Sequence, residues 1–204
     1  KGVYESLNDT SFSENMFNLV PYFLFNHDFK SIFMPSAADF QKAEEFRCDI
    51  TDLDAHGIVL LNGFYPTIHD KLRQLPGGIW IGSMNEASKQ FSDKIEKHYG
   101  KYVNGNQDGL VHLNTALASD GVFIYVPEGV VLKKPIQIVN LVQSDEDIFN
   151  QHRNLIIVEK NADITLIVCD HTLSPQKFLT NGVTEIYVGE NSNFDIMRVQ
   201  NEHN

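Results

Sequence analysis

The chain has 204 residues, of which 42% are hydrophobic, so it can bury the core of one large domain or two small ones. It carries 16 Lys and Arg against 27 Asp and Glu, a formal net charge of -11, without a local cluster of basic residues. Such a chain repels phosphate backbones and anionic lipid, and we therefore expect neither nucleic acid nor a membrane as its main partner.

The two cysteines, Cys48 and Cys169, lie far apart and form no CxxC pair, which fits a reducing compartment better than a disulfide scaffold. The chain begins at Lys1 without a basic and then apolar leader, so we expect a cytoplasmic protein. Residues 200–204 are polar and directly follow a repeated segment. A stack of repeats needs a cover at its open end, so we expect this chain to be a piece of a longer protein.

Residues 12–33 are dense in phenylalanine, and their apolar run is too short to span a bilayer. We expect these aromatic side chains to be buried, which is their commoner use. The alternative is an aromatic segment that docks on a partner.

Residues 58–65 form two apolar runs joined by Asn62-Gly63, the strongest short-range signal for a type I′ hairpin. Further on, Ser83 and Glu86 have the spacing of a capping box at the start of a helix. One face of that helix would carry Ala87, Phe91, Ile95 and Tyr99, with Gly100 placed to end it. A second helix is predicted from Asp108, carrying Leu110, Leu113 and Leu117 and stopping before Asp120-Gly121.

Three segments of the second half align with one another. In each segment an apolar strand ends on a valine. Three residues after the valine comes a Gly or an Asn, then a residue with a small or narrow side chain, and a second apolar strand follows. The valines are Val126, Val158 and Val188, and the first interval between them is slightly longer than the second. Repeats of this length are typical of stacked architectures. Gly and Asn tolerate a left-handed backbone, so Gly129, Asn161 and Asn191 are predicted to occupy the same corner of successive repeats.

The repeats favour a solenoid of β coils. The alternative is an antiparallel sandwich, whose strands also alternate and also turn at Gly and Asn. The connections lack a consistent two-residue hairpin signal, and the corner recurs once in every repeat, which argues against the sandwich. We expect an α+β protein, with a mixed helical region over residues 1–120 followed by the start of a β-solenoid domain over residues 121–204.

Cys169-Asp170-His171 is the clearest candidate for a functional site. On a strand, the side chains of Cys169 and His171 would point the same way and could bind one metal ion. A metal site needs further ligands, and the sequence supplies no CxxC or HxxxH to provide them. We therefore expect Cys169 to pack as a small hydrophobic residue and His171 to begin a loop, with no metal site.

The other candidates are weaker. Asp145-Glu146-Asp147 is expected to be a solvated acidic loop, and the eight histidines are scattered without ligand spacing. Pro76-Gly77-Gly78 lacks the Lys-Ser/Thr that a phosphate loop requires. Nothing assembles a nucleophile, a base and an oxyanion donor, so we predict no catalytic, cofactor-binding or metal-binding residues.

Residues 112–136, which begin with His112-Leu-Asn-Thr and include Tyr125-Val-Pro-Glu-Gly-Val, resemble the entry into the β-helix of the SufB/SufD family. Residues 61–65 and 75–81 are similar to the family's hairpin and the segment after it. The resemblance covers most of residues 58–200 and is closer to SufD than to SufB. It implies a scaffold subunit of SUF iron–sulfur cluster assembly with a right-handed parallel β-helix, acting beside SufB and the ATPase SufC.

The family's Cys-x-His-Gly segment and the helices that contact SufC lie beyond Asn204 in this resemblance, so none of its functional residues is assigned here. Cys169-Asp170-His171 is followed by Thr172 in place of Gly and comes too early. We expect no cofactor in this chain, partners that resemble SufB and SufC, and possible self-association through the open end of the solenoid. The alternative function is a polysaccharide lyase or hydrolase, which would need paired carboxylates, or Arg and Lys, on one exposed strand face. Asp163 and Asp195 do not occupy equivalent repeat positions, so its support is thin.

Overall fold

The computed structural model describes residues 35–44, 46, 53–66, 71–102 and 109–201. Our predictions for the phenylalanine-rich residues 12–33, for Cys48 and for the first residue of the helix at Asp108 lie outside these ranges. The helices are α2 (Ala37–Glu44), α3 (Met84–Gln90), α4 (Ser92–His98) and α5 (Gly109–Leu117), with a short 3₁₀ helix η2 (Pro76–Gly78). The strands are β1 (His56–Leu61), β2 (Leu72–Leu75), β3 (Ile79–Ser83), β4 (Val122–Val126), β5 (Ile136–Val142), β6 (Ile148–Val158), β7 (Asp163–Thr172), β8 (Phe178–Val188) and β9 (Asn193–Asn201).

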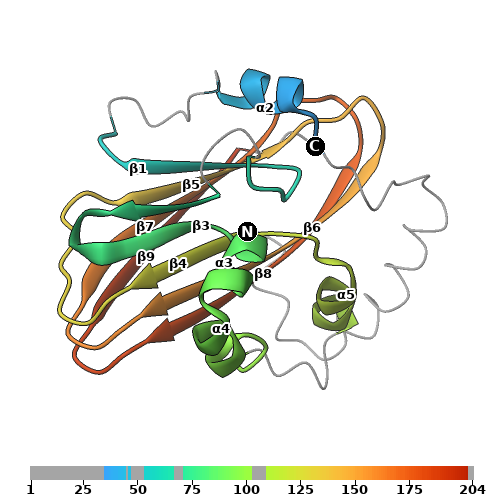
Figure 1. The fold of residues 1–204 in the computed structure, drawn as a ribbon. Coiled ribbons are helices and arrows are strands. Elements are labelled where there is room, and N and C mark those ends of the chain that lie inside the picture. Colours follow the sequence, from blue (N-terminus) through green and yellow to red (C-terminus); the bar gives the residue numbers. More distant parts are fainter. Residues whose placement is uncertain (1–34, 45, 47–52, 67–70, 103–108, 202–204) are drawn as a thin grey trace, which may run out of the picture.

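The strands form two facing sheets. The first sheet has the order β1-β5-β7-β9, and all of its pairs are parallel. The second has the order β2-β3-β4-β6-β8, in which β2, β3 and β4 pair antiparallel and β4, β6 and β8 pair parallel. From β4 onward the chain passes alternately from one sheet to the other (Figure 1). The prediction of an α+β protein is therefore correct, and the antiparallel sandwich is wrong for these strands.

The repeated corner lies where each strand of the second sheet ends. Val126, Val158 and Val188 stand opposite one another in the parallel register. Three residues later, the φ angles are 73° at Gly129 and 57° at both Asn161 and Asn191. Backbone bonds join successive corners, from the Gly129 amide to the Lys160 carbonyl and from the Asn161 amide to the Glu190 carbonyl, each 3.0 Å. The predicted equivalence of the three corners is confirmed.

The register also explains why the first repeat is longer than the second. Val131 pairs with Asp163, whereas Ile136 pairs with Leu166. The difference in residue number between the two paired residues is therefore smaller at Ile136 than at Val131. The extra length of the first repeat is thus accommodated between Val131 and Ile136, where it does not disturb either sheet.

The Asn62-Gly63 turn forms as predicted, with φ angles of 51° and 81° and reciprocal backbone bonds between Leu61 and Phe64. The antiparallel pairing, however, ends with that one pair. β1 instead pairs parallel with β5 over its whole length. The Asn62 side chain extends this pairing, because its amide donates to the Gln143 carbonyl (2.7 Å) and its oxygen accepts from the Gln143 amide (2.9 Å).

The helix predicted after Ser83 is present but broken at Phe91, whose φ and ψ are -125° and 36°. The ring of Phe91 packs between those of Trp80 and Phe123, at centroid distances of 5.6 and 5.3 Å, and this contact holds the kink against the second sheet. The Ser83 hydroxyl caps the Glu86 amide (3.3 Å), but the Ser83 amide donates to the Lys71 carbonyl. Only half of the predicted capping box therefore forms.

The helix α5 ends before Asp120 as predicted, but its fully buried side chain is Asn114 and not one of its leucines. Asn114 donates to the carbonyls of His152 (2.9 Å) and Asn181 (2.7 Å), on β6 and β8. The side-chain amide thus attaches the helix to two neighbouring strands, which leucine cannot do.

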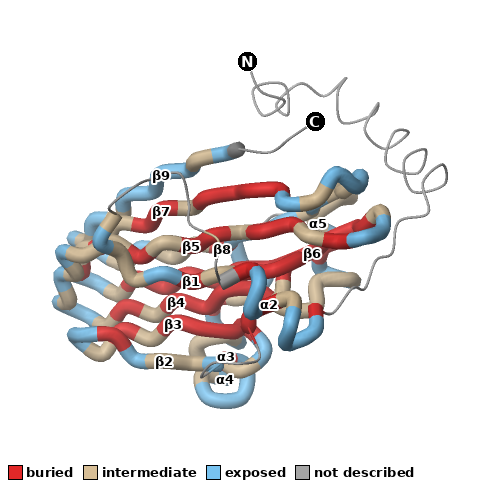
Figure 2. The backbone as a smooth tube through the Cα atoms, turned by 90° about the horizontal axis from the view of Figure 1, so that it is seen from above, coloured by how far each residue is buried: buried red, intermediate tan, exposed pale blue. Residues whose placement is uncertain are grey.

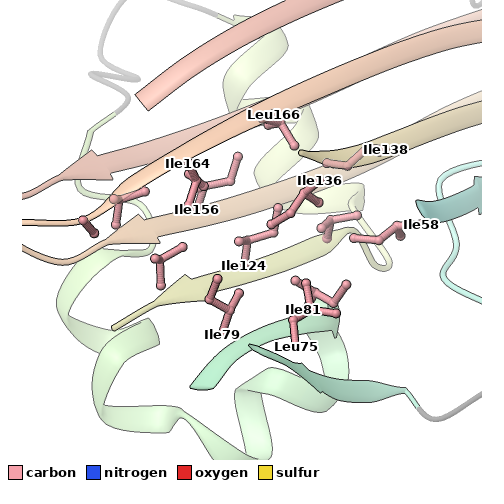
Figure 3. Packing of buried hydrophobic residues seen from close by; sticks show 14 of the residues in the cluster. Ile58, Leu75, Ile79, Ile81, Ile124, Ile136, Ile138, Ile156, Ile164 and Leu166 are labelled. Carbon is pink, nitrogen blue, oxygen red and sulfur yellow. The ribbon is translucent and has the colours of Figure 1, made fainter. Parts of the chain in front are cut away.

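The space between the two sheets is filled by aliphatic side chains, many of them isoleucine, which we call the inter-sheet core (Figure 3). It includes Ile58, Leu60, Ile79, Ile81, Ile124, Ile136, Ile138, Ile156, Ile164 and Leu166. A second cluster lies between the first sheet and α2, and a third between the second sheet and α3 and α4. Each sheet is therefore covered on both faces over much of its area, as parallel strands require.

Candidate functional site

The most exposed part of the two sheets is the end formed by β8 and β9, which we call the open edge (Figure 2). Each of these strands pairs with one neighbour and has none on its other side among the described residues. A strand without a second neighbour presents a row of backbone donors and acceptors, on which another strand can pair. The open edge is therefore a place where a further strand, of this chain or of another, can pair.

Apolar side chains of the inter-sheet core are uncovered at this edge. Ile196 on β9 is 50% exposed, whereas Leu166, which stands opposite it on β7, is 1% exposed. Val188 at the end of β8 is 42% exposed, and Met197, on the other face of β9, is 53% exposed. Exposed apolar groups gathered along unpaired strands are typical of interaction surfaces.

A charged pair lies at the same edge. The Nε of Arg198 donates to Asp170 Oδ2 on the neighbouring strand (2.7 Å), and Asn140 Nδ2 donates to the other carboxylate oxygen (2.7 Å). The Asp170 side chain is 7% exposed and that of Arg198 is 48% exposed. The pair thus links β5, β7 and β9 and places a half-exposed positive charge at the open edge.

A second constellation, the Glu185 clasp, ties the helices to the repeats. The Glu185 carboxylate on β8 accepts bonds from the amides of Gly100 (2.9 Å) and Tyr102 (3.1 Å). It also accepts two from Arg153 on β6, through Nε (3.1 Å) and Nη2 (2.8 Å). The Arg153 guanidinium lies over the ring of Tyr99 and donates to Thr115 Oγ1 on α5 (2.6 Å).

The charges of the clasp are buried, with side-chain exposures of 3% for Arg153 and 0% for Glu185. Burial acts to raise the pKa of Glu185, but the bonds from Gly100, Arg153 and Tyr102 outweigh it and hold that pKa below its ordinary value. The carboxylate is therefore ionised at neutral pH. This pair was not predicted, because its signal in the sequence is only one charged residue in each of two otherwise uncharged strands.

The residues singled out for chemistry do not form a common site. Cys169 is fully buried in the cluster beneath α2, as predicted, and accepts a bond from Gln137 Nε2 (3.4 Å). His171 does not begin a loop as expected but lies within β7, where its ring packs against Phe46. Asp170 between them contacts Asn140 and Arg198. The described parts of the chain hold no group of three or more His, Cys, Asp or Glu side chains placed to bind a metal ion.

The acidic residues behave largely as expected. Asp145 and Glu146 are exposed in the loop between β5 and β6, while Asp147 is half-buried and accepts from the Lys177 amide in the equivalent loop of the next repeat (3.0 Å). Asp163 stands opposite Asn193, and Asp195 stands opposite Thr165, so the two aspartates are not at equivalent positions. Asn193 Nδ2 lies 3.3 Å from one carboxylate and 3.2 Å from the other.

Within the described residues, every helix is too short or too polar to cross a membrane.

Comparison with known proteins gives relatives of one kind. The chain is 29% identical over 154 residues to an iron–sulfur cluster assembly SufBD family protein of Synechocystis, covering 71% of this chain and 34% of that protein. It is 28% identical to the iron–sulfur cluster assembly protein SufD of Bacillus subtilis over 126 residues, which is 61% of this chain and 29% of SufD. It is 30% identical to SufB of the same organism over 125 residues, which is 61% of this chain and 27% of SufB.

The chain thus spans about a third of the length of the curated relatives it matches. Two family models also match it. The SufBD protein N-terminal region matches residues 18–138, which is more than half of the chain, and the SufBD core domain of SUF system iron–sulfur cluster assembly matches residues 141–204. Because these models match along most of its length, the chain belongs to the SufBD family.

Proposed function

We propose that the chain is part of a non-catalytic scaffold subunit for iron–sulfur cluster assembly and that it acts by holding partner proteins. The observation that carries this proposal is the match of two SufBD family models, which cover residues 18–138 and 141–204 and supply the process. Stacked repeats also present an extended surface that is suited to hold partner proteins.

The proposal includes a more specific fold. The repeats would be consecutive coils of a right-handed parallel β-helix, beginning near residue 121 after an N-terminal region that spans residues 1–120. Parallel pairing at one register in each sheet supports successive coils. The right hand follows from the preference of twisted strands for right-handed crossovers between parallel neighbours.

The partners would be a subunit that resembles SufB, a name that one of the relatives carries, and a SufC-like ATPase, as the resemblance to the SufB/SufD family implies. This part of the chain would bind no cofactor of its own and would work in the cytoplasm. Contact with the ATPase would require residues beyond Asn204, whereas the open edge would receive either further coils of the longer protein or a second copy of this chain.

Pull-down of the ATPase tests the assignment of partners. We expect the full-length protein to retain the SufC-like ATPase and a fragment of residues 1–204 to lose it. Binding of the ATPase to the fragment as tightly as to the full-length protein would contradict the placement of that contact. Failure of the full-length protein to bind either SUF subunit would contradict the scaffold role itself.

A further inference from the structure

The inter-sheet space is not apolar throughout. On β6, the inward-facing positions run from Val158 and Ile156 in the inter-sheet core to Asn154, His152 and Asn150. On the facing sheet, Ile138 is followed by Asn140 on β5, and Val168 by Asp170 and Thr172 on β7. One end of the space is therefore lined by polar side chains, which we call the polar interior.

Several polar atoms of this interior are buried without a partner. They are Asn140 Oδ1, Asn150 Oδ1, His152 Nδ1 and Thr172 Oγ1. Three of the four residues are more than nine-tenths buried, with exposures of 6% for Asn150, 7% for His152 and 8% for Thr172. Native proteins seldom leave buried polar atoms unpaired, since each one costs free energy of desolvation.

None of these atoms has a hydrogen-bond partner among the described residues. The Asn140 amide is fixed by the bond from its Nδ2 to Asp170 Oδ1 (2.7 Å), so its oxygen remains an acceptor. Asn150 Oδ1 is likewise an acceptor, and His152 is kept neutral by burial, which lowers its pKa to about 4. The Asn140 and Asn150 oxygens, on β5 and β6, therefore need a donor, and the His152 Nδ1 and the Thr172 hydroxyl also need a partner.

The surroundings leave little room for a large ligand. The imidazole of His152 lies directly beneath Gly182 of β8, where a Cβ atom would come 2.5 Å from Nε2. Beside Asn150 a cavity of about 10 Å³ is lined by Asn62, Phe64, Ser119 and Gln151 among others, and this volume is near the lower limit for one water molecule. A ligand that fills such gaps must be small and must donate hydrogen bonds.

We propose that the polar interior is a binding site for ordered water, which donates to the oxygens of Asn140 and Asn150 and pairs with His152 Nδ1 and the Thr172 hydroxyl. The water molecules would form part of the fold, joining β5, β6 and β7 where aliphatic packing stops. They would also solvate the buried Asp170 carboxylate beside Arg198.

A crystal structure of the full-length protein, at a resolution that shows ordered solvent, tests the site directly. We expect density within hydrogen-bond distance of the four unpartnered atoms. Empty, dry space at these atoms would overturn the proposal. Strong anomalous density there after soaking with thallium(I) would also overturn it, because that ion marks a site for a monovalent cation such as ammonium or potassium.

Stability measurements give a second test. Thr172→Val keeps the shape of the side chain and removes the hydroxyl. If that hydroxyl binds water, the variant should unfold more readily, with an unfolding equilibrium constant raised about fivefold. Thr165→Val, on the other face of the same strand, is the matched control and should change it little. A Thr172→Val protein as stable as wild type, or more stable, would show that the hydroxyl was buried dry and would contradict the inference.

Discussion

Asn161 and Asn191 have φ angles of 57°, a conformation that costs most residues free energy and that Gly and Asn adopt with least strain. They and Gly129 turn the chain from the second sheet to the first at the same point of every repeat. The side chain at this single position therefore decides whether the next strand begins in register.

Replacement of Asn161 tests this role. Asn161→Val should lower the free energy of unfolding by about 1–2 kcal/mol, because a β-branched residue resists the left-handed conformation. Asn161→Gly should leave it within about 0.5 kcal/mol of wild type. Urea unfolding followed by circular dichroism measures both. Equal stability of the two variants would mean that the corner does not depend on backbone conformation at residue 161.

His152 predicts a dependence of stability on pH. Burial lowers its pKa to about 4 in the folded protein, with Asp170 opposing the effect and Arg198 adding to it. The unfolded chain, with an ordinary pKa near 6.5, therefore binds the proton more tightly. The contribution of neutral His152 to the free energy of unfolding is complete above about pH 6.5. It should be lost as the pH drops from 6.5 to 4, which lowers the free energy of unfolding by up to about 3 kcal/mol.

Urea unfolding at several pH values measures this loss of stability in the wild-type protein and in the His152→Gln variant. His56 and His98 also have pKa values lowered by burial, so part of the slope should remain in the variant. The difference between the two slopes is the contribution of His152. Identical slopes in wild type and variant would show that His152 protonates equally well in the folded and unfolded states.

At the scale of the elements, the helices are attached to the sheet by polar contacts as well as by aromatic packing. The third cluster places Phe91, Ile95 and Tyr99 against the second sheet, and the Glu185 clasp adds four donors to one buried carboxylate. Because Glu185 and Arg153 lie on neighbouring strands, the clasp ties the segment after α4 to two successive repeats.

Removal of one charge from the clasp should be costly. Glu185→Gln leaves Arg153 buried without its counter-ion and should destabilise the protein by about 3–5 kcal/mol. The matched control is Glu86→Gln, which breaks the pair with Lys89 on the surface of α3 and should have little effect. The midpoints of thermal unfolding of the two variants, each compared with wild type, measure the two effects. Similar midpoints for both would show that the clasp contributes no more than a surface ion pair.

At the scale of the whole molecule, β9 at the open edge is exposed along most of its length, whereas β5, β6 and β7 are largely buried (Figure 2). Ile196 and Val188 belong by position to the inter-sheet core but face solvent there. A fragment that ends after Asn204 therefore exposes both apolar area and unpaired backbone, and association between copies would cover them.

Self-association of such a fragment should depend on the edge. Ile196→Glu places a charge in the exposed apolar surface and should weaken association by about tenfold or more. Val131→Glu is the control, because Val131 is 62% exposed but lies at the corner after β4, away from the last strands. Sedimentation velocity over a range of concentrations measures the effect. A wild-type fragment that stays monomeric would exclude edge pairing, and equal association of the two variants would place the contact elsewhere.

Some features of the structure could be predicted from the sequence, and others could not. The Asn62-Gly63 turn, the cap at Ser83 and the burial of Cys169 followed from residues close in the chain, because turns and caps depend on local backbone preferences. The break at Phe91 did not, since its cause is aromatic contact with Trp80 and Phe123 from two strands. Nor did the buried Asn114, whose partners are carbonyl groups of distant strands.

The sequence by itself determined the repeat and its corner, because the alternation of apolar residues and a left-handed position are properties of each short segment. Only the tertiary structure decided which strands are neighbours, such as β1 beside β5, which lie far apart in the chain. It alone also decided which polar residues face inward, as His152 and Asp170 do, and which charges meet, as Arg153 and Glu185 do. The physical reason is that pairing across the sheets depends on the register and burial of the whole assembly, which no single segment encodes.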